Sequence, residues 1–289
     1  MRTFSWTVSA VASLALAACG SNTVDTGTGT GGAGAGTTGG SAAGTTTGAP
    51  VDYPAPAKGE VYGIGVGNTF PNLALEGGAL LNLSPTAALD CLPKDSCTTT
   101  SPNFVSSFTY QDLYFAGKPA GSSNTDTAGL SITGQGFRYA FVDISGAWCI
   151  HCKQEAGTLP DTYVADWLAE GGIVFSILVQ DAQDANPATQ STLFSWVKTY
   201  QTNYPISIDT QENMLTTANI QAWPGNVIVR LHDMQVIESV LGAGDSFYQD
   251  FAKHLTDCEN DPTNPTDCYP NSTCQTSSTS STGFSCVAN

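Results

Sequence analysis

The run Trp148-Cys149-Ile150-His151-Cys152 constrains this chain more than any other part of its sequence. It follows the apolar residues 139–144, which predict a buried strand, and it begins the stretch 149–170, whose large apolar residues recur at helical spacing. Two intervening residues place both sulfurs on the first helical turn, close enough to bridge, where unpaired backbone N–H groups favour a thiolate. We therefore expect a redox dithiol with Cys149 as the nucleophile. A merely structural disulfide is the alternative.

The surrounding sequence predicts an α/β domain. Residues 172–179 are rich in β-branched side chains, and with the first strand and the helix they form a parallel crossover unit. The further expected elements are helices at 191–200, 212–220 and 245–255, and strands at 205–208, 226–231 and 235–241. Before the dithiol, residues 67–77 predict a short strand-like segment closed by Gly77-Gly78, and the stretch from about 91 to 135 an irregular insertion.

This order of elements around Trp-Cys-x-x-Cys resembles the thioredoxin superfamily. Within it, the segments Phe70–Leu75, Cys152–Glu155 and Phe175–Val179 are similar to the TlpA-like, AhpC/TSA-type redoxins. The resemblance implies a thioredoxin-like fold, a central mixed sheet flanked by helices, over residues 58–257. It also implies a thiol–disulfide oxidoreductase in which Cys149 forms a mixed disulfide and Cys152 resolves it.

Asp143 lies six residues before Cys149, which is the spacing of the buried acidic residue in thioredoxins. A carboxylate desolvated beneath the dithiol has a raised pKa and can take the proton of Cys152, so we expect Asp143 to be catalytic. The alternative is a strand-end aspartate that faces solvent. The alternation of Val142 and Ile144 around it leaves its orientation open.

The dipeptide Trp223-Pro224 resembles the cis-proline segment that lies opposite the disulfide in this superfamily and pairs with a bound substrate strand. By that resemblance, Trp148, Trp223 and Pro224 are the expected substrate-binding residues; an ordinary trans-proline turn is the alternative. Ile150 and His151, between the cysteines, are expected to tune the redox potential, since a histidine at the helix start stabilises the thiolate. An exposed His151 without redox consequence remains the other interpretation.

The first residues predict export. Arg2 precedes an apolar stretch, and Leu16-Ala17-Ala18-Cys19 resembles the bacterial lipobox, in which the cysteine is acylated and becomes the mature terminus. We expect a signal peptide at 1–18 and lipid on Cys19; an ordinary cleaved signal is the alternative. Residues 19–57 are dominated by Gly, Thr, Ser and Ala and predict a flexible tether. The expected location is the bacterial cell envelope, at the periplasmic or outer-membrane surface.

The chain has nine cysteines, and eight remain once one is assigned to lipid, which suits an oxidising compartment. Cys91 and Cys97 are separated by five residues, including Pro93, and predict a structural disulfide. A second redox pair is the alternative, disfavoured because no helical pattern follows Cys97.

The cysteine-rich tail at 258–289 resembles the first four cysteines of an EGF-like module, including the ending Gly-Phe-Ser-Cys. By that analogy Cys258 pairs with Cys274 and Cys268 with Cys286, although four cysteines allow three connectivities. The tail contains too little apolar surface to fold without bridges. It is interpreted as a stapled, protease-resistant end, with protein recognition as the alternative.

Nine basic against 25 acidic residues give a net charge of −16, which excludes nucleic acid as a partner and any attraction to anionic lipid headgroups. The expected partners are protein thiols and disulfides, an upstream redox protein, and the membrane through the lipid. Neither cofactor nor metal is expected. Three alternatives stay open: a non-enzymatic lipoprotein with a partner-binding tail, a thiol peroxidase, disfavoured by Gly146 and by the few arginines, and a copper-handling protein that also uses His232.

Overall fold

The computed structural model describes residues 53–81, 97–118, 123–125, 131–133, 135–183, 186–242, 244–260, 272–276 and 284–288. The expected signal peptide, lipidated Cys19, most of the tether, Cys91 and Cys268 lie outside them. The elements are β1 (Ala74–Leu80), β2 (Phe104–Thr109), α1 (Tyr110–Ala116), β3 (Ser123–Thr125), β4 (Ser131–Thr133), β5 (Tyr139–Gly146), α2 (Ile150–Thr162), α3 (Val164–Ala169), β6 (Gly172–Gln180), α4 (Gln190–Tyr200), β7 (Ile206–Ile208), α5 (Asn213–Ala218), β8 (Gly225–Arg230), β9 (Gln235–Leu241), α6 (Asp245–Asn260), β10 (Ser272–Thr276) and β11 (Phe284–Ala288).

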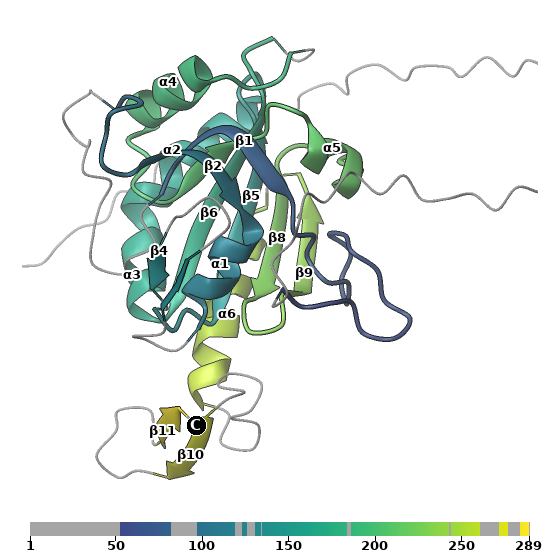
Figure 1. Cartoon of the computed structure of the whole chain (residues 1–289), viewed down its shortest axis with the longest axis vertical. Coiled ribbons are helices and arrows are strands. Elements are labelled where there is room, and N and C mark those ends of the chain that lie inside the picture. The colour runs from purple at the N-terminus through teal and green to yellow at the C-terminus, as the bar shows by residue number, and fades with distance from the viewer. Residues whose placement is uncertain are drawn as a thin grey trace, which may run out of the picture. The chain divides into compact units, whose positions relative to one another are not determined.

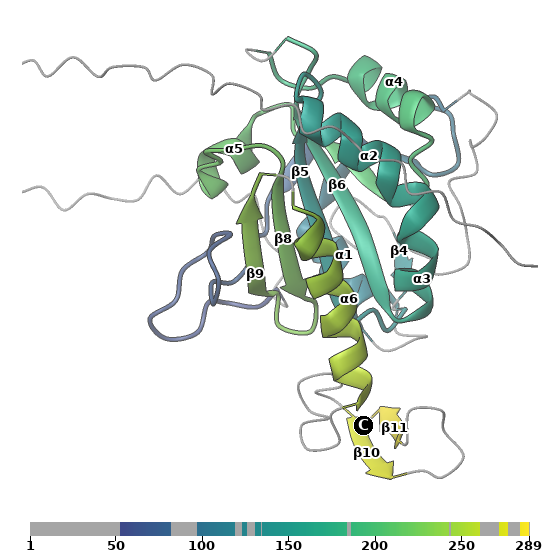
Figure 2. The same cartoon turned by 180° about the vertical axis from the view of Figure 1, so that it is seen from behind.

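The main sheet has seven strands in the order β2-β1-β7-β6-β5-β8-β9. β5, β6 and β7 are parallel to one another, whereas β8 pairs antiparallel with β5 and β9 antiparallel with β8, so the sheet is mixed as expected. α1 lies in front of the sheet in Figure 1, and the reverse view in Figure 2 shows α2, α3 and α6 covering its other face. This is the thioredoxin-like fold that the sequence predicts.

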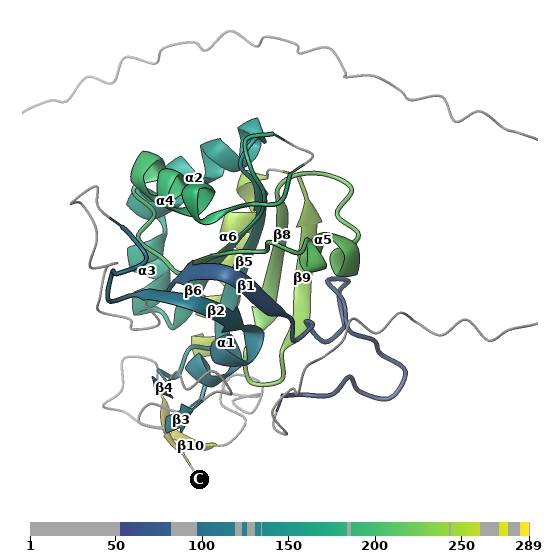
Figure 3. The ribbon, with the colours of Figure 1, turned by 45° about the horizontal axis from the view of Figure 1, so that its top comes forward.

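Strand β5 is buried along its whole length because helices cover both of its faces. Ala140, Val142 and Ile144 pack into the apolar cluster that also contains Leu113 and Ala116 of α1. Figure 3 shows α1 beside β2. Tyr139 and Phe141 pack instead against α2, α3 and α6. Alternation along a strand therefore directs Asp143, like Phe141, toward α2, which settles the orientation that the sequence left open.

The expectation of an irregular insertion before β5 is wrong for the described part of that stretch. β2 pairs with β1 at the edge of the sheet, and α1 follows it directly. The reason is aromatic packing: Phe108 stacks on Phe175 with ring centroids 4.7 Å apart, and Tyr110 meets Phe70 edge to face at 4.8 Å. These rings cover one face of the sheet, which the polar Ser- and Thr-rich composition concealed.

Gly77-Gly78 does not close the first strand. β1 continues to Leu80, and the glycines form an irregularity at which its register with β2 shifts. Gly77 has a φ of +107°, and a Cβ there would overlap the methyl group of Thr210. Glycine is therefore required at this bulge because both the backbone conformation and the neighbouring side chain exclude other residues.

The single helix expected at 149–170 is two helices. α2 ends at Thr162, and Tyr163, with φ −123°, separates it from α3. Pro160, in the last turn of α2, has no N–H to donate to the preceding turn, so the helix is weakened shortly before its end.

Local structure is described on both sides of residues 58 and 257. Before residue 58, the hydroxyl of Tyr53 donates to the carbonyl of Phe70 at 2.8 Å. α6 continues to Asn260 and includes Cys258. In the tail, β10 and β11 form an antiparallel hairpin with Cys274 opposite Cys286 in register, while the tail's disulfide connectivity stays a prediction. Among the described residues, no helix is both long and apolar enough to span a bilayer.

Candidate active site

The dithiol lies at the start of α2, directly after β5. Cys149 is the N-cap of the helix, and its Sγ accepts the backbone N–H of Cys152 at 3.2 Å. Both thiols are free and buried, with exposed fractions of 4% and 0%. The thiol of Cys152 and the backbone N–H groups of Cys152 and His151 stabilise a thiolate on Cys149, and they lower its pKa to about 6 against the effect of burial.

The pKa of the second cysteine, Cys152, is shifted in the opposite direction. Burial raises the pKa of the Cys152 thiol far above its ordinary value, and the neighbouring Cys149 and Asp143 raise it further. At neutral pH the pair therefore carries its negative charge on Cys149 and its proton on Cys152. This division provides one nucleophile and one resolving thiol that must lose a proton before it reacts.

Asp143 lies fully buried on the α2 side of β5, not at a solvent-facing strand end. The hydroxyl of Ser145 donates to its Oδ1 and the hydroxyl of Ser176 to its Oδ2, each at 2.6 Å. Burial raises the pKa of Asp143 to about 6, and the two hydroxyls act against that rise. A carboxyl group that titrates near neutral pH beneath a protonated thiol has the chemistry of a proton acceptor for Cys152.

Glu155 is a second buried carboxyl group at this site, and the sequence interpretation assigned it no role. It is 3% exposed, and the side-chain amide of Asn226 donates to its Oε2 at 3.2 Å. Burial, and then the charge of Asp143, raise its pKa well above the ordinary value. The burial of Glu155 could have been predicted from its spacing, because it lies three positions after Cys152, on the same face of the helix as the buried Leu159.

Two tryptophans flank the dithiol. The Trp223–Pro224 peptide bond is cis, the isomer that the resemblance implies, and the half-buried Trp223 meets Trp148 edge to face at 6.0 Å. The indole N–H of Trp148 donates to Gln180 at 2.9 Å, and Gln180 in turn donates to Glu212 at 3.1 Å. The sequence interpretation missed this polar chain because its members are far apart along the sequence.

The two residues between the cysteines face outward. Ile150 is 62% exposed, and His151 is exposed with its Nδ1 3.2 Å from the side-chain oxygen of Gln154. His151 contributes to the low pKa of Cys149 chiefly through its backbone N–H and less through its ring charge. The surface beside the nucleophile therefore combines the apolar side chains of Ile150, Trp148 and Trp223 with the exposed imidazole of His151.

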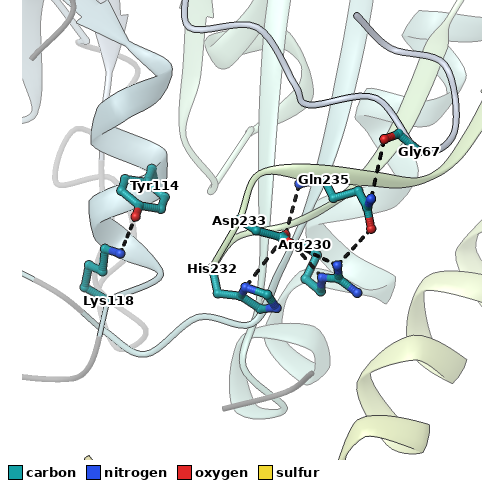
Figure 4. A network of polar contacts seen from close by, with 7 residues as sticks. All are labelled: Gly67, Tyr114, Lys118, Arg230, His232, Asp233 and Gln235. Atoms are coloured by element: carbon teal, nitrogen blue, oxygen red, sulfur yellow. Dashed lines mark hydrogen bonds and ion pairs between the residues drawn. The ribbon is translucent and has the colours of Figure 1, made fainter. Parts of the chain in front are cut away.

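A thiol peroxidase would be expected to have a hydroxyl residue three positions before the reactive cysteine and an arginine beside it, and neither is present at Cys149 among the described residues. A Cβ at Gly146 would lie 2.9 Å from Nε1 of Trp148, so the indole excludes a hydroxyl residue at that position. Arg138 and Arg230 lie at the opposite end of β5 from Cys149. Figure 4 shows the guanidinium of Arg230 held by polar neighbours, and its Nη2 lies 2.6 Å from Oδ2 of Asp233.

The copper ligand set is likewise separated. His232 belongs to the turn between β8 and β9, and its Nδ1 lies 3.8 Å from Oδ1 of Asp233 (Figure 4). Because β8 runs antiparallel to β5, this turn lies at the end of the sheet away from the dithiol. No group of three or more potential ligands occurs within the parts of the chain that the structure describes.

Cys97 is disulfide-bonded and, like Trp148, packs against the apolar cluster that contains Cys149. Its expected partner, Cys91, lies outside the described residues, so that pairing stays a prediction. A bridged Cys97 leaves Cys149 and Cys152 as the free thiols among the cysteines whose side chains are described.

No protein-family model matches the chain, and no curated protein does. Among solved structures, it is similar to a protein described as the thiol:disulfide interchange protein DsbE of Chlorobium tepidum, with 12% identity, a TM-score of 0.40, and coverage of 65% of this chain and 94% of that one. AhpC of Mycobacterium tuberculosis shares 13% identity with a TM-score of 0.41, covering 66% and 92%. The thioredoxin domain of a thiol-disulfide oxidoreductase from Bacteroides vulgatus shares 18% with a TM-score of 0.35, covering 48% and 99%. At these identities the likeness concerns the fold alone.

Proposed function

We propose that this protein is a thiol–disulfide oxidoreductase that exchanges disulfides with protein substrates through Cys149 and Cys152. The observation that carries the proposal is the unequal pair at the start of α2. The Sγ of Cys149 is stabilised as a thiolate by the N-terminal turn of the helix, whereas the buried Cys152 retains its proton. A merely structural disulfide has no need of a stabilised thiolate or of a buried acid beside it.

The exchange has two steps. The Cys149 thiolate attacks a substrate disulfide, forming a mixed disulfide and releasing one substrate thiolate, which takes a proton from water. Cys152 then gives its proton to the carboxylate of Asp143 and attacks the Cys149 sulfur, which releases the second substrate thiolate. The substrate gains two electrons, and the protein ends with a Cys149–Cys152 disulfide. The same steps in reverse oxidise a substrate dithiol.

The large apolar side chains of Ile150, Trp148 and Trp223 beside Cys149 suit a protein substrate. Ile150 projects into solvent beside the nucleophile, and the Trp148–Trp223 pair lies next to the cis-proline segment, where substrate backbone would bind. An upstream redox protein returns the dithiol to its starting state. The lipobox-like Cys19 and the Gly-rich tether support attachment of this domain to a membrane in the bacterial cell envelope.

The proposal is tested by disulfide exchange with a disulfide-containing protein, using the full chain and two matched variants. Cys149→Ser should abolish exchange, because the nucleophile is lost. Cys152→Ser should instead accumulate a mixed disulfide, because attack still occurs and resolution does not. Full exchange by Cys149→Ser would overturn the proposal, as would failure of Cys152→Ser to trap any substrate.

A further inference from the structure

The two buried carboxyl groups beneath the dithiol have different hydrogen-bond donors. Asp143 receives two hydroxyl groups at 2.6 Å, one on each oxygen. Glu155 receives the amide of Asn226 at 3.2 Å and a hydrogen bond from the phenol of Tyr248, and both lower its pKa against the effect of burial. Hydroxyl donors at 2.6 Å are typical of charge-assisted hydrogen bonds, so the donor sets favour charge on Asp143 and neutrality on Glu155.

Among the described residues, the titratable groups near Asp143 supply no positive charge to it. The titratable groups that face it are Cys152 and Glu155 from α2 and Tyr204 from the segment before β7, and none of them carries positive charge. Among the described side chains, no basic group acts on Asp143. Its neighbours on β6 and β5, Ser176 and Ser145, are therefore the groups that offset its burial.

We propose that Ser145 and Ser176 are positioning residues that hold Asp143 as a carboxylate, so that it can accept the proton of Cys152, while Glu155 remains protonated. This proposal rests on the proposed function for its consequence, because proton transfer from Cys152 is a step of disulfide exchange. Pairs of acids whose environments separate their protonation states divide their roles in this way. Without the serines, burial would keep the proton on Asp143 and remove the base.

Ser207 of β7 provides a matched control. Its side chain is fully buried, and its Oγ has no hydrogen-bond partner within the described part of the chain. Its neighbours Ile206 and Ile208 pack toward α4, so alternation directs Ser207 to the opposite face of the sheet from Asp143. Replacing Ser207 by Ala removes a buried hydroxyl from the same sheet without touching the carboxylate.

The experiment follows the carboxyl carbon of Asp143 by NMR during a pH titration of the reduced full chain, with the signal assigned by its loss in Asp143→Asn. Wild type and Ser207→Ala should titrate with a midpoint near pH 6. Ser145→Ala and Ser176→Ala should each raise the midpoint by roughly one pH unit, since a hydrogen bond to a charged group corresponds to about that shift. Ser176→Thr retains a hydroxyl and should restore the wild-type midpoint.

A second readout is the rate at which the mixed disulfide is resolved as a function of pH. In each variant, the midpoint of this pH dependence should shift in the same direction as the titration midpoint of Asp143. An unchanged midpoint in both alanine variants, or an equal change in Ser207→Ala, would overturn the proposal. The titration requires no exchange activity, so the two proposals fail separately. A moved midpoint in an inactive chain would refute the proposed function, whereas an active chain with an unmoved midpoint would refute the role of the serines.

Discussion

Replacing Asp143 by Asn should stabilise the folded protein at neutral pH. Burial raises the pKa of Asp143 from its ordinary 3.8 to about 6. Each unit corresponds to about 1.4 kcal/mol, so ionising this group in the folded state costs up to roughly 3 kcal/mol at pH 7. Asparagine carries no charge and avoids that cost, and its carbonyl oxygen can still accept a serine hydroxyl.

The sign of the effect follows from where the proton is held. The folded state binds it more tightly than the unfolded state, so the contribution of Asp143 to stability is full below about pH 3.8 and is lost as the pH rises through about 6. Urea unfolding of the reduced wild type and Asp143→Asn should therefore differ at pH 7 and converge near pH 3.5. No gain at pH 7, or the same gain at both pH values, would refute this reasoning.

Three further outcomes are expected. The rate of alkylation of Cys149 by iodoacetamide should rise with pH, with a midpoint near pH 6. Cys152→Ala should raise that midpoint by at least about one pH unit, because the Cys152 thiol is the largest cause of the low pKa of Cys149. An unmoved midpoint would contradict this. Gly77→Ala should lower the free energy of unfolding, measured in urea, by more than about 1 kcal/mol. The φ of Gly77 is positive, and the methyl group of Thr210 occupies the place of a Cβ. A variant as stable as the wild type would show that glycine is not required at this bulge. Gln180→Leu should raise the KM for a protein substrate and change kcat less. The substitution removes the hydrogen bond that orients the indole of Trp148 and leaves both thiols in place. An unchanged KM would show that the orientation of this ring does not affect substrate binding.

The parts of the fold that were predictable from the sequence are those whose signals are local. Strand β5, the start of α2 and the hairpin of β8 and β9 each follow from a periodic apolar run. The burial of Asp143 was suggested by its spacing from Cys149, but its orientation required the sheet, because only the helices packed on each face define which side is which.

The features that sequence reasoning missed depend on contacts between distant segments. Phe108 and Tyr110 stand in a polar stretch, and their role in the core appears only when Phe175 packs against them. Ser176 reaches Asp143 across 33 positions of sequence. Glu155 is different, because its position three residues after Cys152 and four before Leu159 already predicts a buried face of α2.

The most direct test of the account is the reduction potential of the Cys149–Cys152 pair. The full chain is equilibrated with a series of glutathione ratios, the free thiols are alkylated, and the reduced fraction is counted by mass spectrometry. The stabilised Cys149 thiolate favours the reduced form, so we expect a potential above about −300 mV, in the range of disulfides that exchange with protein thiols. A potential below about −300 mV, typical of structural disulfides, would contradict the assignment of this pair as a redox site.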